Sequence, residues 1–142
     1  MAEATMEPFE TLDHTADVGI AAHGATLEDL FANAASGMFS IITDLDRVEP
    51  REKREITAHA PDRPGLLVAF LGELLYRFEV DRFITRRVEV TRLTDTELTA
   101  TAHGEPIGPQ HALDAEIKAV TRHELTVEKR GDTWHATVLF DI

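Results

Sequence analysis

Two stretches of the chain repeat apolar residues at the spacing of one helix face, and this constrains the fold more than any other feature. The first stretch begins after Thr26, and the second begins after Asp62 and Pro64. Thr26 with Asp29 resembles a capping box in which Asp replaces Glu, and Pro64 is tolerated in a first helical turn. The apolar positions are Leu27, Leu30, Phe31, Ala34, Ala35, Met38, Phe39 and Ile42 in the first helix, and Leu67, Phe70, Leu71, Leu74 and Phe78 in the second. Each predicted helix therefore has one stripe to bury against another layer.

Short alternating segments surround these helices and predict strands. We expect strands at about 9–13, 16–23, 48–60, 83–93, 97–107, 117–129 and 133–142, with a break near Thr15. Strand pairs interrupted by two helices predict an α+β fold, a mainly antiparallel β-sheet structure with the two amphipathic helices packed against it. A doubly wound parallel sheet is the weaker alternative, because helices do not alternate regularly with strands. The length predicts a single domain over residues 1–142.

The charge and the missing cysteines exclude several classes of protein. Fourteen basic and twenty-six acidic residues give a net charge of −12. Such a surface repels phosphate, so we expect no direct nucleic-acid binding, and a metal ion or a basic protein is a more natural partner. Without cysteine, the chain has no disulfide and no thiolate nucleophile or metal ligand. We find no leader and no long apolar segment, and therefore expect a cytoplasmic protein without a membrane span.

Common catalytic motifs are absent from the sequence. There is no Gly-rich phosphate loop, dinucleotide fingerprint, His-Glu-x-x-His or Gly-x-Ser-x-Gly, and Ser36 and Ser40, the only serines, fall inside the first helix. The "RGD" at 130–132 reads as a hairpin turn rather than an adhesion motif. The histidines at 14, 23, 59, 103, 111, 123 and 135 show no metal-ligand spacing, although His14 and His123 lie in unusual stretches.

Two acids interrupt apolar strands and suggest a metal site. In "LDHTADVGI" at 12–20, Val18 and Ile20 share a face, so Asp17 points to the other side. In the terminal "TWHATVLFDI", Asp141 likewise points away from the apolar face, next to the free carboxylate of Ile142. If the two strands are neighbours, the acids converge, and paired carboxylates need protons or a hard cation such as Ca²⁺ or Mg²⁺ between them. The alternative, which the pattern alone favours, is that both acids are solvated positions on an outer face.

Blocks along nearly the whole chain resemble the archease family. They are "DHTADVGI" at 13–20, "LEDLFANAASGMF" at 27–39, "LLVAFLGELLY" at 66–76, "EIKAVTRH" at 116–123 and the terminal "DI". Two positions depart from the family pattern, because Arg122 replaces an aromatic residue before His123, and Phe70 stands where Trp is frequent. We expect the first to alter a partner contact and the second to be a substitution within the core.

The resemblance implies an accessory protein rather than an enzyme. Archeases are cofactor proteins of RtcB-type RNA-splicing ligases, and they promote ligase guanylylation and repeated turnover in tRNA splicing or RNA repair. It further implies a metal site, for which we expect Ca²⁺, with Mg²⁺ or Mn²⁺ as alternatives, and an RtcB-type ligase as the partner. We expect the protein to be a monomer that binds neither nucleic acid nor membrane. The metal ligands that it implies are Asp17, Asp141 and Ile142.

Three further residues are candidates for a supporting role, in which they hydrogen-bond to the metal ligands and orient them, or contact the ligase. They are Asp13, His14 and His123. The small residues Ala16 and Gly19 would keep this neighbourhood uncrowded. Two other functions stay open on the sequence: a stand-alone metal-dependent hydrolase with His14 or His123 as base, and a chaperone-like binding module.

Overall fold

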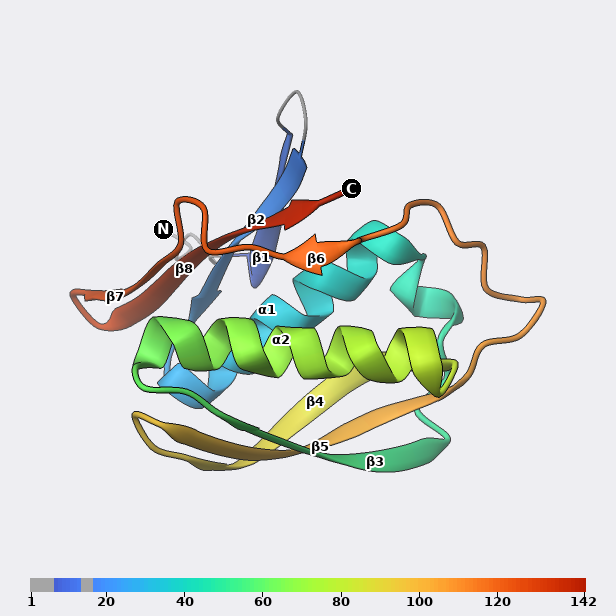
Figure 1. The fold of residues 1–142 in the computed structure, drawn as a ribbon, viewed down its shortest axis with the longest axis horizontal. Helices are drawn as coiled ribbons and strands as arrows, with labels where there is room; N and C mark the ends of the chain where they lie inside the picture. Colours follow the sequence, from blue (N-terminus) through green and yellow to red (C-terminus); the bar gives the residue numbers. More distant parts are fainter. Residues whose placement is uncertain (1–6, 14–16) are drawn as a thin grey trace, which may run out of the picture.

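The computed structural model describes residues 7–13 and 17–142 and has the predicted α+β class. Figure 1 shows the order of its elements along the chain. The helices are α1 (Leu27–Ile42) and α2 (Arg63–Val80), with a short 3₁₀ turn, η1, at Leu45–Arg47. The strands are β1 (Phe9–Asp13), β2 (Asp17–Gly24), β3 (Glu52–His59), β4 (Phe83–Leu93), β5 (Glu97–Pro106), β6 (Ala119–Val120), β7 (Thr126–Arg130) and β8 (Thr133–Asp141).

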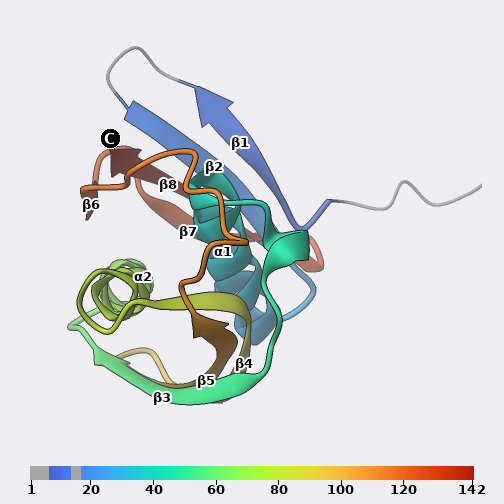
Figure 2. The same ribbon diagram turned by 90° about the vertical axis from the view of Figure 1, so that its right-hand side faces the viewer.

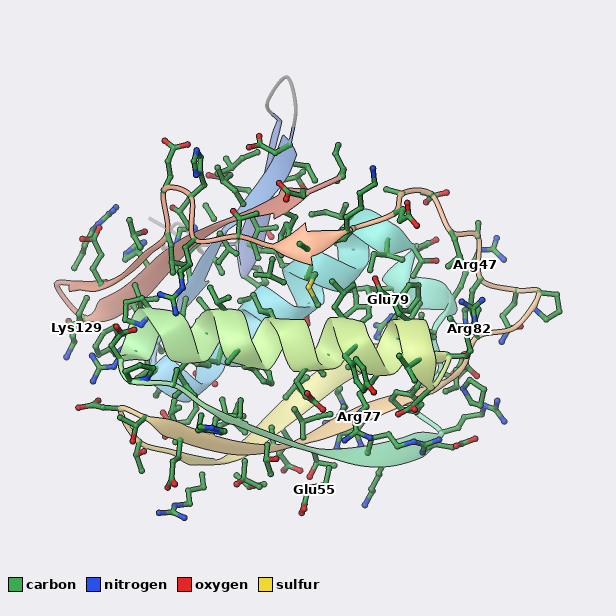
Figure 3. The ribbon with its side chains drawn as sticks, viewed as in Figure 1. Arg47, Glu55, Arg77, Glu79, Arg82 and Lys129 are labelled. Atoms are coloured by element: carbon green, nitrogen blue, oxygen red, sulfur yellow. The ribbon has the colours of Figure 1, made fainter. Side chains whose placement is uncertain are left out.

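The strands form two separate antiparallel sheets. In the first sheet the order is β1-β2-β8-β6, and β7 also pairs with β8; in the second it is β3-β5-β4. Both helices lie between the sheets, as Figure 2 shows, with α1 in contact with β2 and β4 and α2 in contact with β3 and β4. The second sheet turns its other face to solvent, where side chains such as Glu55 point away from the helices (Figure 3). The helices are therefore packed as predicted, but against two sheets.

The predicted caps and stripes account for the two helices. The hydroxyl of Thr26 accepts a hydrogen bond from the N–H of Asp29 at 3.0 Å, and the carboxylate of Asp62 accepts one from the N–H of Gly65 at 2.7 Å. These bonds satisfy backbone donors that a helix leaves unpaired at its start. The stripe of α1 is buried from Leu30 to Ile42, between the two sheets.

The predicted strand 117–129 is wrong as a single element. The chain forms β6 and β7, separated by a turn in which Glu124 has a positive φ of 52°. A left-handed residue cannot continue a strand, so the backbone bends there. The predicted strand 48–60 begins later, at Glu52, because the segment before it follows η1. The expected break near Thr15 lies outside the described residues.

No helix within residues 7–13 and 17–142 is both long enough and apolar enough to cross a membrane.

Candidate metal centre

The structure brings Asp17 and Asp141 directly opposite each other. Strand β2 begins at Asp17 and β8 ends at Asp141, and the two residues are cross-strand partners in the antiparallel register. The C-terminus consequently lies beside the start of β2 (Figure 1). Partners in an antiparallel pair project from the same face of the sheet, with Cβ atoms about 4.5–5.5 Å apart. Asp17 and Asp141, which the sequence placed off the apolar faces of their strands, are therefore neighbouring acids on one face of the sheet.

The main-chain bonds of Asp141 show which kind of cross-strand pair this is. Its carbonyl accepts a hydrogen bond from the N–H of Lys118 at 2.8 Å, so its polar backbone groups point towards β6 and away from β2. Asp17 and Asp141 thus form a non-hydrogen-bonded pair, the type in which facing side chains come closest. Oδ1 of Asp17 is shielded from solvent, whereas Asp141 is exposed. The pair therefore has a shielded oxygen on Asp17 and a solvent-exposed residue, Asp141, opposite it.

Gly19 explains how the strands fit together beside the acids. A Cβ atom on Gly19 would lie 2.4 Å from Cδ2 of Leu139 and 2.6 Å from the carbonyl oxygen of Val138. Leu139 is Gly19's cross-strand partner, and it is buried although it lies on the outer face. The glycine makes room for this leucine, which leaves an apolar side chain next to Asp141. Ala16 lies outside the described residues.

The other candidate residues occupy different positions. Ile142 follows Asp141, and 49% of its surface is exposed, in contrast to the fully buried Phe140. Asp13 is the cross-strand partner of Val18, next to Asp17 in the sequence. His123 is exposed in the turn between β6 and β7, where its N–H donates to the hydroxyl of Thr121, and His14 lies outside the described residues.

The oxygen atoms at this end of β2 and β8 suit a hard cation, but the described residues supply only part of its coordination shell. The carboxylates of Asp17 and Asp141 and the carbonyl oxygen of Ile142 are all oxygen donors, which Ca²⁺ and Mg²⁺ prefer to nitrogen or sulfur. Among the side chains that the structure describes, no three His, Asp or Glu residues gather as a metal-binding group. Further ligands would come from Ile142, from water or from a partner.

A sequence model of the Archease protein family matches residues 9–142. The chain belongs to the archease family. Among its relatives are the archease of Methanosarcina mazei, 41% identical over 139 residues and covering 94% of this chain and 95% of that protein, and the archease of Thermococcus kodakarensis, 36% identical and covering 96% and 100%. The solution structure of protein 1598 of Methanobacterium thermoautotrophicum has a TM-score of 0.80 at 37% identity and covers 96% of this chain and all of that one.

The crystal structure of an archease from Thermotoga maritima, described as a possible chaperone, has a TM-score of 0.66. It covers 99% of this chain and all of that one at 20% identity, and this likeness supports the archease fold alone.

The two departures from the archease pattern lie in different environments. Phe70 is fully buried and stacks on Phe31 with ring centroids 6.0 Å apart, as expected for a core position. Arg122 is exposed and reaches across the start of α2, where a Cβ on Gly65 would lie 2.7 Å from its guanidinium nitrogen. Its expected effect on a partner contact stays a prediction.

The sequence did not reveal a buried charged cluster at the end of β5. The Glu105 side chain is 1% exposed and accepts hydrogen bonds of 2.8 Å from the N–H of Glu49, the guanidinium of Arg51 and Nε2 of His111. The N–H of Gly108 donates to Nδ1 of His111, which identifies Nε2 as the protonated ring nitrogen. Burial alone would raise the pKa of Glu105, but these donors outweigh it and lower that pKa to about 2. The cluster fastens the neighbouring loops to β5.

Proposed function

We propose that this archease activates an RtcB-type RNA ligase, promoting its guanylylation and repeated turnover in tRNA splicing or RNA repair. In this proposal the protein works in the cytoplasm, is not itself the catalyst, and acts through a divalent cation held by Asp17, Asp141 and an oxygen of Ile142. The main support for the proposal is that Asp17 of β2 and Asp141 of β8 lie opposite each other. Membership of the archease family supports the choice of partner.

The two carboxylates account for the need for a cation. Two ionised acids on a non-hydrogen-bonded cross-strand pair repel each other, and a divalent ion removes this repulsion. Ca²⁺ is the preferred candidate, because it accepts six to eight oxygen ligands in flexible geometry and so tolerates a shell completed by water or a partner. When bound, the ion supplies a positive centre at an exposed edge of an otherwise acidic protein.

The charge of the chain favours a protein partner over RNA. A net charge of −12 opposes binding to a phosphate backbone, whereas a cation at the end of β8 gives one local exception. Asp13, His14 and His123 are the residues that we assign to the contact with the ligase or to the support of the metal ligands.

A guanylylation assay with a cognate ligase tests the proposal. We expect the protein to increase the rate and number of turnovers in the presence of a divalent ion, and Asp17→Asn and Asp141→Asn to abolish this effect. Asp132→Asn, the same change in the exposed β7–β8 turn, is the matched control and should activate fully. If the wild-type protein changes neither guanylylation nor turnover with any divalent ion, the proposal is wrong.

An extended chain tests the role of Ile142. Adding Gly-Ser after Ile142 keeps its side chain but replaces the terminal carboxylate by a neutral amide. If the carboxylate is a ligand, metal affinity and activation should fall while the fold is retained. If the extended protein binds the metal and activates as before, Ile142 supplies at most a neutral carbonyl oxygen.

Two rival functions make different predictions. A stand-alone hydrolase would turn over phosphate esters or carboxylic esters without the ligase, although the described candidate base, His123, lies in the β6–β7 turn and not at the start of β2 or the end of β8. A chaperone-like module would suppress aggregation of unrelated proteins. Tyr76 and Val80, both more than half exposed and one turn apart on α2, are candidates for its apolar contact surface. Activity only in the presence of a ligase distinguishes activation from both.

A further inference from the structure

Two histidines face each other at the opposite end of the same strand pair. His23 of β2 and His135 of β8 are cross-strand partners, six residues from Asp17 and Asp141 respectively. At about 3.3 Å per residue, this places them about 20 Å from the carboxylate pair. Their Nδ1 atoms are 2.9 Å apart, and the rings meet edge to face with centroids 4.8 Å apart and planes at 81°.

The backbone fixes this pair in place. The N–H of His23 donates to the carbonyl of Pro8 at 2.9 Å, and its carbonyl accepts from the side-chain amide of Asn33 at 2.6 Å. Both polar groups of His23 are therefore engaged on the side away from β8, so His23 and His135 are a non-hydrogen-bonded pair with closely spaced side chains. Both histidines are only partly buried, so the pair lies near the surface of the protein.

The surroundings keep the ring nitrogens available as ligands. Burial, together with the neighbouring His23, lowers the pKa of His135. A neutral imidazole has one nitrogen with a free electron pair, and in the observed pair one Nδ1–H donates to the other Nδ1. A cation could replace this shared proton if the proton moved to Nε2 of its own ring, with no net loss of protons.

The separation of the nitrogens indicates which metals fit. With metal–nitrogen bonds of about 2.0–2.1 Å, two nitrogens at about 90° around one ion lie about 2.9 Å apart, whereas tetrahedral angles require about 3.4 Å. The hydrogen bond between the rings already holds the two nitrogens at 2.9 Å, so a right-angled arrangement needs less movement of the rings than a tetrahedral one. Imidazole ligands at right angles are typical of Cu²⁺ and Ni²⁺, while tetrahedral sites are typical of Zn²⁺.

A hollow adjoins His23 at this end of the strand pair. It has a volume of about 300 Å³ and is lined by His23, Gly24, Asp29, Asn33 and Thr133, among others. Asp29 is another residue of its lining, and the open side of the hollow admits water or a small molecule. With only two ligands from the protein, the remaining coordination positions of the ion are open to water, and the ion can exchange with solvent.

We propose that His23 and His135 form a two-histidine chelate for a divalent transition-metal ion, Cu²⁺ or Ni²⁺, separate from the carboxylate pair. The β2–β8 register supplies both nitrogens, and water or a small ligand from solvent completes the coordination. The site does not depend on the proposed ligase activation, and its test needs no ligase.

Titration of tag-free protein with Cu²⁺ and with Ni²⁺ by calorimetry tests the chelate. We expect one high-affinity ion per chain, and a Cu²⁺ electron paramagnetic resonance spectrum with coupling to two nitrogens. Because linking two ligands raises affinity by about 10²–10⁴ over one, His23→Gln and His135→Gln should each weaken binding about 100-fold or more. His59→Gln, at an exposed histidine of β3, and Asp17→Asn are the matched controls and should retain the high-affinity ion.

A second measurement avoids any dependence on folding of the variants. In nuclear magnetic resonance spectra of the wild-type protein, substoichiometric Cu²⁺ should broaden the ring signals of His23 and His135 before those of His59 and His123. Equal broadening of all four histidines would overturn the proposal, and so would full Cu²⁺ affinity in folded His23→Gln and His135→Gln proteins.

Discussion

Gly19 shows at the scale of single residues how tightly β2 and β8 are joined beside the candidate metal centre. Gly19→Ala would place a methyl group 2.6 Å from the carbonyl oxygen of Val138, a backbone atom that cannot move without separating the strands. We expect a loss of about 1–3 kcal/mol in the free energy of unfolding, measured by urea denaturation. Gly72→Ala is the control, because no atom lies within 4 Å of a Cβ there and it is inside α2.

Gly72→Ala should instead stabilise the protein by about 0.5–1 kcal/mol, since glycine is unfavourable inside a helix. Equal effects of the two substitutions would contradict this explanation of Gly19.

Glu105 gives a prediction about pH. Its pKa is about 2 in the folded protein, below the ordinary value of 4.5, so its contribution to stability is complete above pH 4.5 and is lost as the pH falls towards 2. The shift corresponds to about 3 kcal/mol, and the side chain is buried, so solvent screens it little. Glu105→Gln should therefore lose about this much at pH 7, and its deficit relative to wild type should shrink as the pH falls from 4.5 towards 2.

Urea denaturation of both proteins at pH 7, 4.5 and 3 measures this difference. A deficit that stays the same at all three pH values would show that the carboxylate charge is not what stabilises the cluster.

At the scale of secondary structure elements, β6 depends on few bonds. Thr121 donates from its N–H at 3.0 Å and from its hydroxyl at 2.9 Å to the carbonyl of Leu139. Thr121→Val keeps the shape but removes the hydroxyl bond, and we expect a loss of about 0.5–1.5 kcal/mol. Hydrogen exchange should accelerate at the amides of Lys118 and Thr121 and stay unchanged in the β3–β5 pair. Uniform acceleration in both regions would indicate global destabilisation instead.

The helices could be predicted from the sequence because their signals are local. The stripe from Leu27 to Ile42 and the caps at Thr26 and Asp62 need no knowledge of the rest of the chain. The turn between β6 and β7 could not be predicted, because Glu124 takes a left-handed conformation that normally calls for glycine or asparagine. The alternating pattern therefore predicts one continuous strand where the chain forms two short ones, β6 and β7.

The sequence also could not predict which strands far apart in the chain pair with each other. Alternation in a sequence says which face a residue occupies, but not which residue lies opposite. It placed Asp17 and Asp141 off the core face, and their pairing required β2 and β8 to be neighbours. His23 and His135 have the same relation, yet they are 112 residues apart and carry no spacing signal. The division of the strands into two sheets could not be predicted for the same reason.

At the scale of the whole molecule, the excess of acidic residues destabilises the compact state. A net charge of −12 on 142 residues produces self-repulsion, which monovalent salt screens over a Debye length of about 10 Å at 0.1 M. Added sodium chloride should therefore raise the melting temperature gradually. This general effect acts on all exposed charges alike and must be separated from the binding of an ion at Asp17 and Asp141.

Calcium at constant ionic strength makes that separation. An ion that binds only the folded protein stabilises it by RT ln(1 + [L]/Kd), about 2.7 kcal/mol at a hundredfold excess over Kd. We expect Ca²⁺ to raise the melting temperature beyond matched sodium chloride, with a dependence on concentration that follows binding. The additional rise should disappear in Asp17→Asn and Asp141→Asn but persist in Asp132→Asn, which loses the same charge in the β7–β8 turn. In metal-free buffer the first two variants should be as stable as wild type or slightly more so, because each removes one of two repelling carboxylates. A large drop in their metal-free melting temperature would instead identify the acids as structural, and a calcium effect no greater than that of matched salt would exclude an ion site at this strand pair.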